Sequence, residues 1–237
     1  MAETKQLVRL YPIRFRYLEG SQQFKKYQWI KARISKPNQD SRPESYTIFP
    51  DSIEMGEVVP ATRNWEERCS WVINPNTVFS SMEALRAAQK DTGKSLGVVK
   101  PDKIKRIFFQ NRNEADIKEA ITKKNSVINQ LDLFETKKDL YIMPIRIMIE
   151  FFCKNPDCSG HKMSILDWEF MQLFRKLEKD PNWKEKIKEK IMGQIFDKTR
   201  DTHLILGNMA GHPQTFCVLG FFWPPYQKVT RQMSLFD

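Results

Sequence analysis

Residues 6–17 of the sequence read QLVRLYPIRFRY, and this stretch decides the fold class predicted for the N-terminal part of the chain. Apolar and basic residues alternate along it, and a period of two places the basic side chains on one face of a β-strand. Pro12 cannot donate a ladder hydrogen bond, so we expect this strand at a sheet edge or at a bulge. Residues 27–34, YQWIKARI, repeat the pattern, and residues 46–49 form a third short strand. The sequence therefore predicts a β-rich N-terminal part.

The rest of the chain predicts a mixed α+β structure. Apolar residues recur near helical spacing in residues 164–178 and 183–196, which indicates two amphipathic helices. Shorter helices are expected at residues 64–68 and 80–90, and Ser80-Ser81-Met82-Glu83 has the composition of a helix N-cap. Strands are expected over residues 95–101, 104–109, 139–153, 202–206 and 216–223.

Three regions follow from these elements. We expect a β-rich nucleic-acid-binding part over residues 1–92, an α+β part over residues 93–225 and a flexible tail over residues 226–237. The polar residues 115–138 are expected to be loop in part. A single mixed domain is the alternative to two parts.

The charge of the chain is concentrated at its start. The chain has 39 Lys and Arg against 29 Asp and Glu, and residues 1–36 hold nine cations and two anions, a local net charge of +7. Such a basic segment points to a polyanion, most often nucleic acid, although solubility alone is the alternative. A basic sheet face interleaved with aromatic rings is one way in which small barrels bind single strands. The residues predicted to contact nucleic acid are Arg9, Arg14, Arg16, Lys25, Lys26, Lys31 and Arg33.

Composition also limits the setting in which the chain works. No apolar run approaches the ~20 residues that span a bilayer, and the first residues do not resemble a secretory signal. Four cysteines in 237 residues are too few for a disulfide framework. We therefore expect a cytoplasmic protein with reduced thiols and no membrane partner.

The sequence ends on a short linear motif, QMSLFD. It resembles the pentapeptide, commonly Gln-Leu-(Ser or Asp)-Leu-Phe, by which bacterial DNA polymerases and repair proteins dock on the replication sliding clamp. The matching residues are Gln232, Met233, Ser234, Leu235 and Phe236. The resemblance implies that the Leu and Phe side chains enter an apolar pocket on the clamp while the Gln side chain hydrogen-bonds at its rim.

A second copy of the motif lies inside the chain and fits the full pattern. Its residues are Gln130, Leu131, Asp132, Leu133 and Phe134. The alternative for this copy is that its apolar side chains pack into the core, so the tail is the better docking segment.

Cys153, Cys158 and His161 have the spacing Cys-x4-Cys-x2-His on a turn that follows a predicted strand. Thiolates and imidazole suit tetrahedral zinc, and ligands clustered in this way indicate a structural site. A fourth ligand would come from His203, His212, Cys217 or water. The alternative is an ordinary turn with packed free cysteines.

Glu150, Asp167 and Glu169 are weak candidates for a divalent-metal nuclease centre. Asp167 and Glu169 are two residues apart, so on a helix they diverge by ~200° and would share one ion poorly. Acidic residues at a helix N-terminus also complement the helix dipole without any catalytic role, and this is the favoured interpretation.

Three stretches together resemble a family of poorly characterised prokaryotic proteins. They are residues 8–18, residues 24–30 with 42–46, and residues 160–169 followed by 204–208 and 220–225. The resemblance implies a dual OB-like β-barrel domain. Members of that family begin earlier, which implies a first barrel that is incomplete or is completed by a partner protein. Some members lack the Cys-Cys-His cluster, which implies that zinc is not essential to the fold.

These observations predict a non-enzymatic, DNA-associated accessory protein that binds nucleic acid and docks on the sliding clamp. Such a protein would serve replication, DNA repair, a mobile element or antiviral defence against phage. A metal-dependent nuclease is the first alternative. An RNA-binding module, with the tail motif a coincidence, is the second.

Overall fold

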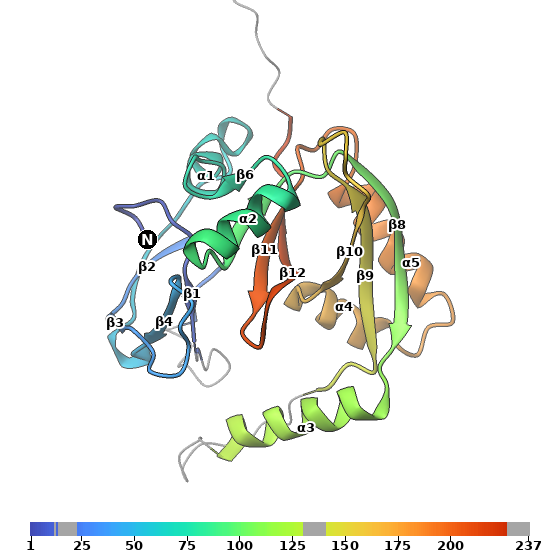
Figure 1. The fold of residues 1–237 in the computed structure, drawn as a ribbon, viewed down its shortest axis with the longest axis horizontal. Helices are drawn as coiled ribbons and strands as arrows, with labels where there is room; N and C mark the ends of the chain where they lie inside the picture. The colour runs from blue at the N-terminus through green and yellow to red at the C-terminus, as the bar shows by residue number, and fades with distance from the viewer. Residues whose placement is uncertain (12, 14–22, 130–140, 227–237) are drawn as a thin grey trace, which may run out of the picture.

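The computed structural model describes residues 1–11, 13, 23–129 and 141–226 of the chain (Figure 1). A seven-stranded mixed sheet dominates it, with the strand order β6-β7-β11-β12-β10-β9-β8. Its strands are β6 (Val78–Phe79), β7 (Leu96–Val99), β8 (Lys103–Asn111), β9 (Ile145–Phe152), β10 (His161–Ile165), β11 (His203–Met209) and β12 (His212–Phe222). Two antiparallel hairpins, β9–β10 and β11–β12, meet where β10 runs parallel to β12.

The chain contains helices as well as strands, so the predicted α+β class is confirmed. The α-helices are α1 (Glu66–Val72), α2 (Met82–Thr92), α3 (Glu114–Asn129), α4 (Trp168–Leu177) and α5 (Trp183–Glu189). The π-helical segment η5 (Lys190–Ile195) follows α5, and the 3-10 turns η3 (Pro50–Ser52) and η4 (Arg63–Trp65) lie in the N-terminal part. Within the described residues, no helix has both the length and the apolar composition needed to cross a bilayer.

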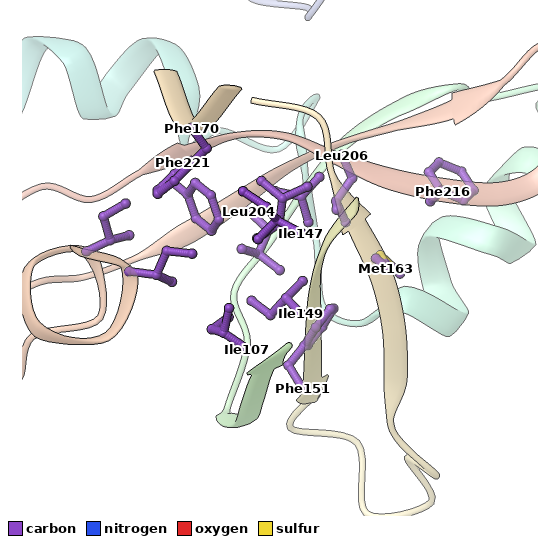
Figure 2. Close-up of a cluster of buried hydrophobic side chains, with 14 of the residues drawn as sticks. Ile107, Ile147, Ile149, Phe151, Met163, Phe170, Leu204, Leu206, Phe216 and Phe221 are labelled. Atoms are coloured by element: carbon purple, nitrogen blue, oxygen red, sulfur yellow. The ribbon is translucent and has the colours of Figure 1, made fainter. Parts of the chain in front are cut away.

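The main core lies on one face of the large sheet (Figure 2). Alternate side chains of β9, namely Ile147, Ile149 and Phe151, are completely buried, as the period of two in a strand requires. Phe170 of α4 packs edge-on against Phe221 of β12 with ring centroids 5.6 Å apart. Helices α2, α4 and α5 all contribute side chains to this cluster, so these three helices cover the same face of the sheet.

The N-terminal part forms two small sheets. One has the order β1-β4-β3, and the other pairs β2 with β5. The strands are β1 (Arg9–Leu10), β2 (Gln28–Lys31), β3 (Ile34–Ser35), β4 (Ser45–Ile48) and β5 (Glu54–Val58). The predicted strand 27–34 is therefore divided between the two sheets. No closed barrel forms within the described part of the chain.

Several boundaries differ from the sequence-based expectation; β9, for example, starts at Ile145 and not at residue 139. Residues 115–138 were expected to be loop in part; α3 occupies Glu114–Asn129, and Asn113 accepts the backbone N–H of Asp116 at its start. Ser164 and Ile165 end β10 instead of opening a helix, and α4 starts only after Asp167. Residues 130–138 lie outside the described residues.

A buried polar contact joins the small sheets to the large one. The Glu44 carboxylate accepts hydrogen bonds from the Ser95 backbone N–H at 3.1 Å and from the Ser95 hydroxyl at 2.6 Å. Lys94 lies 3.4 Å from the same carboxylate. Arg9 donates to the hydroxyls of Ser45 and Ser95, each at 3.1 Å. It therefore links β1 to the residue that precedes β7.

An aromatic contact joins the same two regions at another point. Tyr27 and Trp65, from the N-terminal part, meet Phe222 at the end of β12 with ring centroids 6.3 Å and 5.9 Å away. Burial raises the pKa of the Tyr27 hydroxyl to about 12. Strand β6 belongs with the large sheet because it pairs with β7, and α2 belongs with it because Met82 and Leu85 lie in the main core.

Candidate functional site

Four potential metal ligands converge at one end of the large sheet. Glu83, Cys153, Cys158 and His161 each offer one ligand atom, and these atoms all lie within 4.8 Å of one another. Cys153 follows the last residue of β9, and His161 begins β10 opposite Phe151. The fold of the hairpin therefore brings the three residues predicted from their spacing into one place.

The turn between β9 and β10 depends on Gly160. Its φ of +92° lies in the region that side-chain-bearing residues avoid. A Cβ atom at this position would also lie 3.1 Å from the Phe152 ring. Gly160 thus lets the chain reverse sharply between Cys158 and His161.

Short distances link the ligand atoms directly. The Nε2 atom of His161 lies 3.2 Å from the Cys158 sulfur and 3.2 Å from Oε1 of Glu83. The Cys153 sulfur accepts the backbone N–H of Met82 at 3.4 Å, and the Cys158 sulfur accepts the backbone N–H of Cys153 at 3.3 Å. Backbone donors to sulfur stabilise a thiolate, as the outer contacts of metal sites do.

Burial sets the protonation of the isolated side chains. Burial raises the pKa of the Cys153 thiol to about 11 and lowers the pKa of the His161 imidazole. His161 therefore keeps a neutral ring with a free lone pair at neutral pH. Two sulfurs, one imidazole nitrogen and one carboxylate oxygen are a donor set that fits tetrahedral zinc.

The fourth member of this cluster, Glu83, is the part that the sequence did not predict. His203 instead has its Nδ1 3.0 Å from the Asp201 carbonyl oxygen, and Cys217 accepts a hydrogen bond from the Ser164 hydroxyl at 3.2 Å. Glu83 takes the position beside His161, although it lies 70 residues before Cys153 in the chain. The only local signal was that Glu83 stands in the first turn of a predicted helix.

The three candidate nuclease carboxylates have separate environments. Glu150 accepts from Lys105 at 3.0 Å and from Arg106 at 2.6 Å, and these hydrogen bonds lower its pKa. Asp167 caps α4 by accepting the Glu169 backbone N–H at 2.8 Å. Glu169 itself pairs with Lys26 at 3.3 Å. Among the described residues, the only group of three or more potential ligands close enough for one ion is the one at Cys153.

The basic residues of the N-terminal part divide into engaged and exposed ones. Arg9 is bound between Ser45 and Ser95, and burial lowers its pKa. Lys31 lies 3.5 Å from Glu54 at the surface. Lys25 and Arg33 are exposed, and the Arg33 guanidinium lies over the Phe49 ring at 4.6 Å.

Lys36 is also exposed and lies over a ring, 3.9 Å from the centre of the Tyr46 ring. Cation–ring pairs of this kind occur on surfaces that bind nucleic acid, although they also occur without such a partner. Arg14 and Arg16 lie outside the described residues, and so do both clamp-motif copies at residues 130–134 and 232–236.

Comparison with family models adds a classification to this fold and site. Residues 78–237 match the model of a domain of unknown function (DUF8757). The match covers more than half of the chain, so the chain belongs to this family. Residues 1–74 match the model of a second domain of unknown function (DUF8758). The division between the two matches falls just before β6, whereas the sequence analysis placed a boundary at residue 92.

The comparison with curated proteins found no match, and the comparison with solved structures found none either.

Proposed function

We propose that this protein is a DNA-associated accessory protein that binds nucleic acid through its N-terminal part and docks on the replication sliding clamp through residues 232–236. The observation that carries the proposal is the basic N-terminal segment, with a net charge of +7 over residues 1–36 and exposed cations beside rings at Phe49 and Tyr46. Cations near a strand attract phosphates, and neighbouring rings offer faces on which bases stack.

An OB-like barrel is the proposed framework for this surface. All five N-terminal strands supply side chains to one small apolar cluster around Ile48 and Ile53. A shared core of this kind supports a barrel, in which two small sheets enclose a single interior. A partner protein that completes the barrel remains part of the proposal.

Nucleic-acid binding is tested by its dependence on salt. The variant Lys25→Glu/Arg33→Glu should bind single-stranded DNA more weakly, and its log-affinity against log-salt slope should fall by about 1.4 if both residues contact phosphates. Lys179→Glu/Lys198→Glu is the matched control, because both residues are exposed and the net charge changes equally. Equal slopes for the two variants would leave the N-terminal charge as solvation. Tighter binding to an RNA oligonucleotide would favour the RNA-binding module instead.

Clamp docking is tested separately with the full chain and with a peptide of residues 226–237. A short peptide with two apolar anchors should bind a bacterial sliding clamp with about micromolar affinity, because it loses conformational freedom on binding. Leu235→Ala/Phe236→Ala should abolish binding of the peptide, and Met233→Leu should preserve or improve it. Loss of the tail from the full chain should leave residual binding only if the copy at residues 130–134 is accessible. A peptide without affinity for the clamp contradicts this part of the proposal.

Zinc is the proposed metal of the cluster at Cys153, Cys158 and His161, in a structural role that fixes the turn after β9. The donor atoms fit zinc because sulfur and imidazole ligands are those it prefers. Protein purified without added metal should contain about one zinc per chain. Cys158→Ser should lose that zinc, and Cys69→Ser, which changes a free cysteine elsewhere, should retain it.

A further inference from the structure

The geometry points to Glu83 as the fourth ligand of this metal centre, so that the bound ion joins the first turn of α2 to the β9–β10 hairpin. The inference rests on the proposed zinc site and names a ligand that comes from a different part of the chain. The other three donors lie within nine residues of one another, whereas Glu83 is 70 residues before Cys153.

The position of the carboxylate is the first argument. Oε1 of Glu83 lies 3.2 Å from Nε2 of His161, and that same nitrogen lies 3.2 Å from the Cys158 sulfur. A nitrogen, a sulfur and an oxygen therefore crowd around one point, with the Cys153 sulfur within 4.8 Å of all of them. Without a cation, a neutral imidazole satisfies only one acceptor with its single N–H.

An unsatisfied atom is the second, independent argument. Oε2 of Glu83 is buried and has no hydrogen-bond partner among the residues that the structure describes. A buried carboxylate oxygen without a partner carries a desolvation cost. A cation bound by the cluster would offset that cost by interacting with the carboxylate charge.

The way in which α2 begins explains how Glu83 reaches the site. Ser81 caps the helix by accepting the Ala84 backbone N–H at 3.2 Å, which fixes the direction of the first turn. Met82 is completely buried and donates its N–H to the Cys153 sulfur. The start of α2 is therefore held against Cys153 by the backbone, and Glu83 is the next residue.

The four ligands differ in exposure and chemistry. The His161 side chain is 3% exposed, whereas the Glu83 side chain is 42% exposed. A carboxylate oxygen is a harder donor than thiolate or imidazole and binds zinc less selectively. Glu83 is accordingly the ligand that leaves the metal most readily. The link between α2 and the β9–β10 hairpin depends on this ligand.

The experiment measures metal affinity with the full chain. Zinc affinity comes from competition with a chromophoric chelator, and the protein loaded with cobalt(II) gives a visible spectrum that reports coordination number. Glu83→Gln should weaken zinc binding by at least roughly 10–100-fold, the range found when an outer contact of a metal site is lost, because here a ligand itself is replaced. It should also change the cobalt spectrum. Glu67→Gln, an exposed carboxylate in the first turn of α1, is the matched control and should change neither.

A gain-of-affinity variant guards against a trivial loss of folding. Glu83→Cys would supply a third thiolate and should bind zinc more tightly than the unmodified chain, with stronger sulfur-to-cobalt charge-transfer absorption. Hydrogen exchange gives a further readout, because removal of the metal should speed exchange at the first amides of α2 in the unmodified chain but not in Glu83→Gln.

The outcomes separate the two proposals. If the unmodified chain binds no zinc, the proposed zinc site fails. If it binds zinc while Glu83→Gln and Glu83→Cys leave both affinity and cobalt spectrum unchanged, the zinc site stands and the role of Glu83 is overturned.

Discussion

Two opposing effects act on the carboxylate of Asp167, a stabilising hydrogen bond and the cost of burying its charge. Its carboxylate caps α4, yet burial raises its pKa above the ordinary value for an aspartate. Because the folded-state pKa exceeds the unfolded one, ionisation favours the unfolded state, and the folded chain loses stability as pH rises from below the unfolded pKa through the folded one. Asn in its place accepts the same N–H without a charge.

We therefore expect Asp167→Asn to gain stability relative to the unmodified chain as pH rises from 3.5 to 7, measured by urea unfolding at both pH values. The exposed Asp51→Asn is the control and should show a much smaller change. An equal effect of Asp167→Asn at both pH values would mean that the charge itself is not destabilising. The sequence placed Asp167 near a helix start but three residues inside the predicted helix, and its packing beside Gly220, which is distant in the chain, was not predictable.

Strand β9 shows how far a local pattern predicts packing. Its odd-numbered residues face the main core, and Ile149 is completely buried, whereas Met148 faces the opposite side and is half-buried. Ile149→Ala should cost about 2–5 kcal/mol, because it removes buried methyl groups and leaves a cavity. Met148→Ala should cost clearly less.

Denaturant unfolding of the two variants measures this difference on one strand. Similar losses would mean that both faces of the sheet are equally well packed. The apolar character of residues 139–153 predicted a strand here, although β9 covers only Ile145–Phe152. Helix α3 was not predictable, because its residues are mostly polar and its stabilising contacts include the ion pair of Asp116 with Arg146 on β9, at 2.7 Å.

At the scale of the whole molecule, the two family-model regions should unfold together. Glu44 is buried and is held by Ser95 and Lys94 from the other region. Glu44→Ala leaves the buried Ser95 N–H and hydroxyl without their acceptor, so it should cost about 3 kcal/mol. Calorimetry should show a single transition that moves to a lower temperature.

Glu54→Ala is the control, because the Glu54 pair with Lys31 is exposed and should be worth at most about 1 kcal/mol. Two separate transitions in Glu44→Ala, with only one of them shifted, would contradict joint unfolding. Neither Glu44 nor Glu83 was predictable as a site residue, because each acquires its partners from residues that only the tertiary fold brings near. The grouping of Cys153, Cys158 and His161 was predictable from their spacing, because one hairpin contains all three residues.

The strand order also governs when the large sheet can form during synthesis. The hairpin of β11 and β12 is made last among its strands, yet it lies between β7 and β10. Until residues 203–222 emerge from the ribosome, β6–β7 on one side and β8–β9–β10 on the other have no strand to join them. Each then presents an unpaired edge to other chains. The nascent protein is thus most prone to aggregate immediately before its final hairpin appears, and a chaperone that covers the β7 and β10 edges would act within that interval.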